Sequence, residues 1–271
     1  MKAIPFIKMD GLGNDFVIID CRKTQEVVSL TAREIENIAN RRTGIGFDQL
    51  FILTDSDKAD VKMTIYNGDG SLAAACGNGS RCIASLIFEE KPSKKEVLIE
   101  APKNRILKAY NNGQISVNMG APDFSWQGIG LAEEKDTSNL TGLLPNMSAC
   151  GVSMGNPHAV FFVEDVSKID LAKVGPLVEH NPLFVNRTNV EFAQVLSPSK
   201  ILMRIWERGA GITQACGSGA SATLAAAYKK GLSSNKAEIV MPGGSLTIEN
   251  KNGEILMAGP VHKALFCEIF L

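Results

Sequence analysis

The feature that most constrains this chain is a short motif that occurs twice, as ACGNG at residues 75–79 and as ACGSG at residues 215–219. Each copy stands between an extended apolar run and a run of helix-forming residues. Self-similarity held in one register indicates a duplicated architecture, so we expect two related half-molecules. The offset of 140 residues (216 − 76) also aligns, without a gap, Tyr66 with Trp206, Asn67 with Glu207, Pro102 with Pro242 and Gly113 with Gly253.

The two halves also begin alike, since a Gly-Asn pair at residues 13–14 and another at residues 155–156 each precede an apolar stretch. Glycine and proline just after residue 119 indicate a boundary between the halves. A chain of 271 residues suits two domains. We therefore expect an N-terminal domain over residues 1–118, a C-terminal domain over residues 119–263, and a last strand at residues 264–271 that returns to the first domain.

Apolar patterning predicts many strands and few helices. A helix is expected at residues 32–41, and one follows each copy of the motif, at residues 77–88 and 217–230. The stretch 123–146 lacks periodicity and is interpreted as a loop, and Asn-Gly turns in both halves favour antiparallel hairpins. The predicted class is α+β rather than a doubly wound parallel sheet. Strands are expected at residues 6–9, 16–20, 50–53, 62–66, 159–163, 191–195, 201–206 and 239–241.

Composition favours a small-molecule partner. The 28 basic and 29 acidic residues nearly balance and form no long run of one sign, so nothing indicates a nucleic-acid partner. No apolar stretch approaches the ~20 residues that span a bilayer, and the first residues lack an apolar signal core, so we expect a cytoplasmic protein without a membrane partner. The 6 cysteines should then stay reduced. The spacing of Cys76 and Cys82 is a poor match to zinc ligation, so no metal is expected.

The repeated cysteine has a chemical interpretation. At a helix start, unsatisfied N–H groups and the positive end of the helix dipole stabilise a thiolate and accept a carboxylate. If both helix starts held one carboxylate, Cys76 and Cys216 would face opposite sides of its α-carbon, roughly 7 Å apart given contacts near 3–3.5 Å. A thiolate base on one side and a thiol acid on the other would invert that centre without an electron-sink cofactor. A single copy would equally suit a small buried cysteine in a packing turn; the duplication favours the chemistry.

Several further motifs accompany the two cysteines, and together they resemble the diaminopimelate epimerase family over almost the whole chain. The motifs are GLGNDF at residues 11–16, GIGFDQL at residues 44–50, NGDGS at residues 67–71, CGNGSRC at residues 76–82, GNPH at residues 155–158, ERG at residues 207–209 and ACGSG at residues 215–219.

The resemblance implies a PLP-independent isomerase that interconverts LL- and meso-2,6-diaminopimelate in lysine and peptidoglycan-precursor biosynthesis, with Cys76 and Cys216 as its acid–base pair. It also implies a homodimer without cofactors, and two closing domains that each wrap a curved, barrel-like, mostly antiparallel sheet around a central helix. His158 and Glu207 would adjust the pKa of the cysteines. Implied substrate contacts are Asn14, Gln49, Asn67, Gly77, Asn78, Asn156, Asn189, Glu207, Arg208, Gly217 and Ser218.

Ordinary structural interpretations of these residues stay open. Glu207 and Arg208 suit the ammonium and carboxylate at the distal end of such a substrate, but also an ion pair at a strand end. The asparagines also suit turn caps, Gln49 a solvent-facing strand position, and His158 a core imidazole. Three other positions, Asp10, Ala159 and Ile212, depart from the usual family pattern.

Two alternative functions are also open. A related cofactor-independent racemase, such as the histidine racemase type, would use the same two thiols on another side chain. The presence of Glu207, Arg208, Asn156 and Asn189 favours a substrate with a second amino-acid head group. A non-catalytic amino-acid-binding protein would have no need of both cysteines, so the intact pair argues against it.

Overall fold

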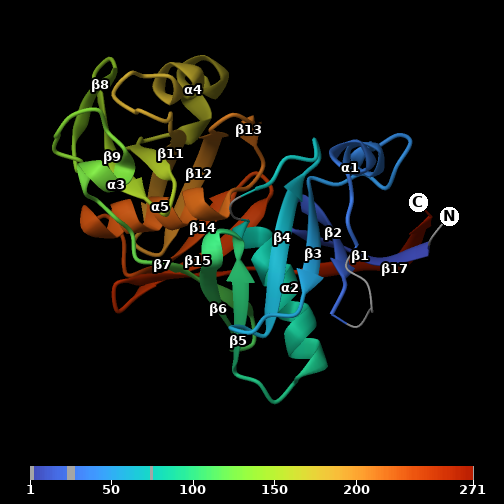
Figure 1. Ribbon diagram of the computed structural model, residues 1–271. Coiled ribbons are helices and arrows are strands. Elements are labelled where there is room, and N and C mark those ends of the chain that lie inside the picture. The colour runs from blue at the N-terminus through green and yellow to red at the C-terminus, as the bar shows by residue number, and fades with distance from the viewer. Residues whose placement is uncertain (1–2, 23–27, 74–75, 271) are drawn as a thin grey trace. The chain divides into compact units, whose positions relative to one another are not determined.

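Contacts divide the chain into two units, the first comprising Met1–Val117 with Gly259–Leu271 and the second comprising Asn118–Ala258 (Figure 1). The computed structural model describes residues 3–22, 28–73 and 76–270. Ala75 of the first motif copy and Leu271 of the expected last strand therefore lie outside the described residues. Each unit is described by itself below.

The first unit is a mixed sheet with helix α2 packed against strands β1, β5 and β6. Strand β1 pairs in antiparallel fashion with β2 and with β17, and β3–β4 and β5–β6 are antiparallel as well. Parallel pairing joins β2 to β3 and β4 to β5. The elements are β1 (Ala3–Gly11), β2 (Asn14–Asp20), α1 (Ala32–Ala39), β3 (Gln49–Thr54), β4 (Val61–Asn67), α2 (Gly77–Glu90), β5 (Glu96–Ala101), a 3₁₀ turn (Pro102–Asn104), β6 (Arg105–Asn111) and β17 (His262–Phe270). Strand β7 (Ile115–Gly120) begins in the first unit, and its residues 118–120 belong to the second.

The second unit surrounds helix α5, which packs against strands β9 to β12 and β14 to β16. Parallel pairing joins β10 to β11 and β12 to β14, and the neighbouring pairs are antiparallel. Its elements are α3 (Trp126–Ile129), β8 (Leu140–Leu144), β9 (Met147–Ser153), β10 (Pro157–Phe162), a 3₁₀ turn (Val166–Lys168), α4 (Leu171–Glu179), β11 (Asn189–Ser197), β12 (Lys200–Glu207), β13 (Gly211–Thr213), α5 (Gly217–Lys229), β14 (Lys236–Met241), β15 (Gly244–Lys251) and β16 (Glu254–Ala258).

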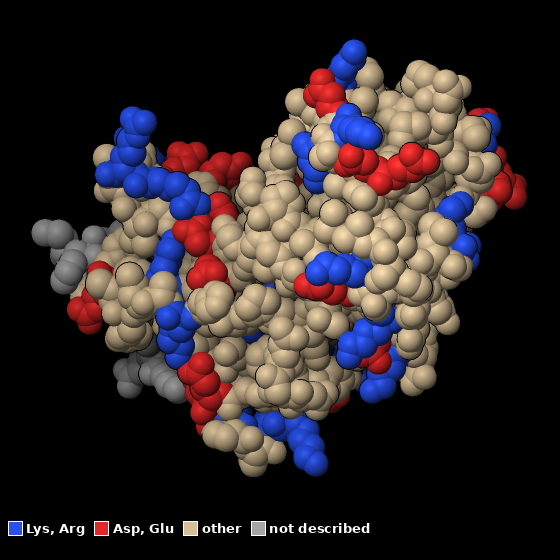
Figure 2. Space-filling model, turned by 180° about the vertical axis from the view of Figure 1, so that it is seen from behind, with Lys and Arg blue, Asp and Glu red and all other residues tan. Residues whose placement is uncertain are grey.

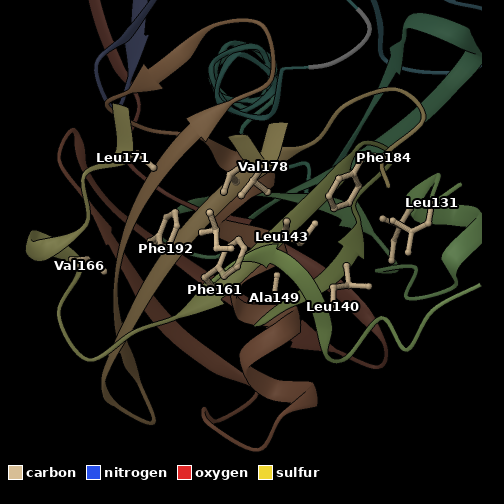
Figure 3. Packing of buried hydrophobic residues seen from close by; sticks show 14 residues of the cluster. Leu131, Leu140, Leu143, Ala149, Phe161, Val166, Leu171, Val178, Phe184 and Phe192 are labelled. Carbon is tan, nitrogen blue, oxygen red and sulfur yellow. The ribbon is translucent and has the colours of Figure 1, made fainter. Parts of the chain in front are cut away.

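A hydrophobic core of the second unit joins the β10–β11 pair to α3, β8 and α4 (Figure 3). Phe161 and Phe192 are partners in the parallel register of these strands, and their rings stack with centroids 5.0 Å apart. Both are fully buried, and burial of a phenylalanine side chain stabilises the folded state by about 1.5–3 kcal/mol. The strands that carry the polar residues described below are therefore anchored by their opposite faces.

The predicted α+β class and mostly antiparallel sheets around a central helix are confirmed. The prediction of a loop over residues 123–146 was wrong, because it contains α3 and β8. Helix α3 is a single turn between the Ser125 cap and left-handed Gly130, too short to show helical periodicity. Helix α4 was not among the expected elements. It contains Pro176, a residue that disfavours a helix interior, and it begins at an Asp170 cap.

Charged side chains of both signs are interspersed on the face shown in Figure 2. Within the part of the chain that is described, no helix has the length and apolar character needed to cross a membrane.

Candidate functional site

Both motif cysteines occupy the N-cap of a helix. Cys76 precedes α2 and Cys216 precedes α5, and both have extended backbone angles, with φ of −153° and −141°. The Gly79 amide donates to Cys76 Sγ at 3.3 Å. Each sulfur therefore stands at the end of a helix where unsatisfied N–H groups and the positive dipole end favour negative charge.

Polar side chains of the first unit fix one another beside Cys76. Asn14, at the start of β2, accepts from Asn78 Nδ2 at 2.8 Å. Asn78 in turn accepts from Arg81 Nη1 at 3.0 Å, and both Asn78 and Arg81 are buried. The first turn of α2 is thereby tied to the β1–β2 hairpin, which orients two of the predicted contact residues.

Asn14 is also held by a network of charged side chains. Its Nδ2 donates to Asp48 Oδ2 at 3.2 Å, and Arg41 bridges Asp48 and Asp15 with distances of 2.7 Å to each. Burial acts to raise the pKa of Asp15, but hydrogen bonds from Arg41 and from Lys8 lower it to about 2. Asp15 is therefore an anion at neutral pH.

Gln49 and Asn67 are direct partners across the antiparallel β3–β4 pair. Gln49 Nε2 donates to Asn67 Oδ1 at 3.0 Å, and Asn67 Nδ2 donates to Ser71 Oγ at 3.0 Å. Gln49 begins β3 and Asn67 ends β4, so both amides lie at the same end of the antiparallel pair. We call Asn14, Gln49, Asn67, Cys76, Gly77 and Asn78 the Cys76 cluster.

Cys216 lies in a more buried setting than Cys76. Burial is the main cause that raises the pKa of the Cys216 thiol well above its ordinary value, and the negative charge of Glu207 adds to it. Ser218 Oγ, 3.5 Å from Cys216 Sγ, acts in the opposite direction. Burial and the charge of Glu207 thus favour the thiol form of Cys216, whereas the helix start favours the thiolate. Glu207, at the end of β12, accepts from Thr213 Oγ1 at 2.5 Å.

A line of hydrogen-bonding groups leads from Ser218 into the interior of the second unit. Asn156 Nδ2 donates to Ser218 Oγ at 3.4 Å, and Asn156 Oδ1 lies 3.1 Å from His158 Nε2. His158 Nδ1 lies 2.6 Å from Glu191 Oε1. Sequence analysis did not identify Glu191. Two signals could have found it: Glu191 follows Asn189 by two residues in a strand, so both point to the same face, and it is a carboxylate in an apolar run.

The Glu207–Arg208 turn is held by two buried groups. Asn189 Oδ1 accepts from the Arg208 amide at 2.9 Å. Glu179, which sequence analysis also missed, accepts from Trp206 Nε1 at 2.6 Å and from the Gly209 amide at 2.9 Å. Burial acts to raise the pKa of Glu179, but these hydrogen bonds lower it.

The predicted contact residues of the second unit thus gather around one helix start and one strand end. We call Asn156, His158, Asn189, Glu207, Arg208, Cys216, Gly217 and Ser218 the Cys216 cluster. Among the described residues of either unit, no group of three or more His, Cys, Asp and Glu side chains is placed to hold a metal ion.

Comparison with known proteins gives a consistent result. A family model described as diaminopimelate epimerase matches residues 6–125 and 150–264. The diaminopimelate epimerase of Rhodospirillum centenum is 46% identical over 269 residues, which cover 97% of this chain and 91% of the relative. That of Carboxydothermus hydrogenoformans is 45% identical over 272 residues, covering 98% of this chain and 99% of the relative.

Solved structures share the fold at low sequence identity. A phenazine biosynthesis protein of the PhzF family from Bacillus anthracis matches with a TM-score of 0.68 and 18% identity, covering 100% of both chains. A hydroxyproline epimerase from Agrobacterium vitis matches with a TM-score of 0.67 and 14% identity, covering 99% of this chain and 91% of that chain.

Proposed function

Since this chain belongs to the diaminopimelate epimerase family, we propose that it interconverts LL- and meso-2,6-diaminopimelate by proton transfer at the α-carbon, as part of lysine biosynthesis. The observation that carries the proposal is the pair of cysteines, Cys76 and Cys216, each at the N-cap of a helix in its own unit. Relatives 41–46% identical to this chain are named diaminopimelate epimerase, which favours this substrate over that of a histidine racemase.

The two thiols have different starting states in the proposed reaction. Burial and the raised pKa of Cys216 favour its protonated form, so Cys216 starts as the acid. Cys76, whose sulfur accepts a hydrogen bond from the Gly79 amide at the helix start, starts as the base. The Cys76 thiolate takes the α-hydrogen as a proton, and Cys216 delivers its own proton to the opposite face of the carbon. The enzyme then holds a Cys76 thiol and a Cys216 thiolate, and the reverse reaction restores the first state.

Binding of the substrate follows from the same residues. First-turn N–H groups at Gly77, Asn78, Gly217 and Ser218 receive the carboxylate next to the reacting carbon and stabilise the charge that develops there. This stabilisation takes the place of an electron-sink cofactor.

The other members of the two clusters select the substrate. Arg208 pairs with the distal carboxylate, and Glu207 receives the distal ammonium. The asparagine and glutamine amides fill the remaining polar contacts, namely Asn14, Gln49, Asn67, Asn156 and Asn189.

The proposal extends to the organisation of the molecule. The two units are the duplicated domains, they close on the substrate to exclude water, and the protein works as a cytoplasmic homodimer. Light scattering measures the dimer, and small-angle scattering with and without a tight substrate analogue measures closure. A monomer, or equal dimensions in both states, would contradict the corresponding part.

The activity is tested by incubating reduced protein, without added PLP or metal, with LL-diaminopimelate in heavy water. We expect meso product with solvent deuterium at the inverted carbon. Cys76→Ser and Cys216→Ser should each lose most turnover, while the exposed Cys267→Ser serves as the matched control with unchanged turnover. Absence of exchange with every diaminopimelate stereoisomer would refute the assignment, and active Cys76 or Cys216 variants would refute the mechanism.

A further inference from the structure

Glu191, on strand β11, is a buried carboxylate to which the proposed reaction assigns no role. It is fully buried in the interior of the second unit. Its Oε1 lies under the first turn of α5, because a Cβ at Gly219 would be 3.0 Å from it. Its Oε2 accepts no hydrogen bond from any described residue. Burial raises the pKa of Glu191, His158 acts to lower it, and Glu207 acts to raise it. A buried carboxylate is costly unless a partner offsets it.

Hydrogen-bond accounting fixes the protons around His158. Asn156 Oδ1 can only accept, so His158 Nε2, 3.1 Å away, must carry a hydrogen. His158 Nδ1 and Glu191 Oε1 are 2.6 Å apart, a separation at which one proton must lie between them. That proton sits on the imidazole or on the carboxyl group, and in both cases the pair carries no net charge.

The consequence reaches the Cys216 cluster. While Asn156 Oδ1 accepts from His158 Nε2, the other end of the same amide, Nδ2, faces Ser218 Oγ at 3.4 Å. Ser218 Oγ in turn lies 3.5 Å from Cys216 Sγ. The contact between Glu191 and His158 therefore orients Asn156, and through Asn156 it orients Ser218 next to Cys216.

We propose that Glu191 is a positioning residue: by retaining one proton in its hydrogen bond with His158, it holds His158 Nε2 as a permanent donor and thereby orients Asn156 and Ser218 next to Cys216. Its part in turnover rests on the proposed epimerase function. In this arrangement His158 donates a hydrogen bond to Asn156 and does not act as a proton acceptor through Nε2.

The first test observes the protons directly by NMR of the full chain with ¹⁵N-labelled histidine. The chain has 3 histidines, and the exposed His180 and His262 can be replaced by glutamine to assign the His158 signals. From about pH 5 to about pH 8, the interval in which an ordinary histidine titrates, we expect His158 Nε2 to stay protonated. Loss of the Nε2 proton within this interval would overturn the proposal.

The second test compares two variants of Glu191. In Glu191→Gln the side-chain amide can donate to Nδ1 of a neutral His158, so the Nε2–H and the net charge are kept, and kcat should stay close to that of the unaltered chain. Glu191→Leu has similar bulk but no hydrogen bond, so we expect the His158 signals to change. We expect kcat to fall by about 10- to 100-fold, the loss usual when the partner that orients a metal-binding histidine is removed.

The outcomes separate this proposal from the proposed function. A Glu191→Leu variant with normal kcat, or a Glu191→Gln variant as impaired as Glu191→Leu, would show that Glu191 does not act by positioning. A merely structural role would lower the melting temperature of a variant without altering the His158 signals. If the unaltered chain has no epimerase activity, the proposed function fails, while the NMR test still decides whether Glu191 fixes His158.

Discussion

The start of helix α2 leaves no room for a side chain at its third residue. A Cβ at Gly79 would lie 2.1 Å from Phe51 Cζ, with the next two ring carbons at 2.7 and 2.9 Å. Phe51 is fully buried and packs edge-on against Phe16, with ring centroids 5.4 Å apart. The ring therefore has little freedom to move away, and we expect Gly79→Ala to push the helix start off the sheet.

The expected cost follows from two opposing effects. Overpacking a core costs about 1–3 kcal/mol, and alanine in place of a helical glycine returns about 0.5–1 kcal/mol. Because the approach is so close, the overpacking term should lie near its upper end, which leaves a net loss of about 2 kcal/mol. That loss corresponds to a fall in melting temperature of roughly 4–8 °C.

The assay is thermal and urea unfolding of Gly79→Ala, Phe51→Leu and the double variant, with Gly219→Ala as the matched control in the second unit. At Gly219 a Cβ would meet Ile205 Cδ1 at 2.6 Å and Glu191 Oε1 at 3.0 Å. These are single atoms at side-chain ends rather than three atoms of a ring, so the loss should be smaller. In the double variant the smaller side chain relieves the clash, and the losses should be less than additive by about 1 kcal/mol. Unchanged stability of Gly79→Ala, or strictly additive losses, would refute the reasoning.

Three further outcomes are expected. Alkylation of Cys216 by iodoacetamide, followed by peptide mass spectrometry with the exposed Cys267 as reference, should be slow at neutral pH. Glu207→Gln should accelerate it, because one cause of the raised pKa of Cys216 is removed. Equal alkylation rates with and without Glu207 would contradict this. Glu179→Ala should lower the free energy of unfolding by about 1–3 kcal/mol, since it leaves buried donors unpaired. It should also raise KM, because Glu179 holds the turn that carries Glu207 and Arg208. A normal KM would argue against that role. Because the folded-state pKa of Asp15 is lowered to about 2, its stabilising contribution is complete above its ordinary pKa of 3.8 and is lost as the pH falls toward 2. Asp15→Asn should therefore flatten the fall in urea midpoint over that interval, and an unchanged slope would contradict the assignment.

The sequence predicted the elements whose signals are local. The helices after Cys76 and Cys216 were found because each follows the same repeated motif, and the second is also an alanine-rich run of high helix propensity. Helix α4 was missed because Pro176 within it argues locally for a break. Its stability comes instead from packing, since a Cβ at Gly175 would meet the Trp206 ring at 2.6 Å.

The candidate site shows the same division between local and distant signals. Residues that resemble family motifs could be named from the sequence, and their roles stay predictions. Glu179 and Glu191 could not be named, because a carboxylate acquires its function from the groups that it meets after folding. Glu191 meets His158 through the parallel β10–β11 pair, in which His158 is opposite Asn189. That register is set by the packing of distant apolar residues, which no short motif encodes.

The pairing of β1 with β17 has a consequence for how the chain acquires its structure during synthesis. Most of the first unit precedes the second unit in the chain, yet one of the two partners of β1 is β17 (His262–Phe270), which follows the whole second unit. The second unit is continuous from Asn118 to Ala258 and has all its strands available sooner. We therefore expect the second unit to complete its fold during synthesis before the first unit, whose β1–β17 pair can form only after the second unit has been made.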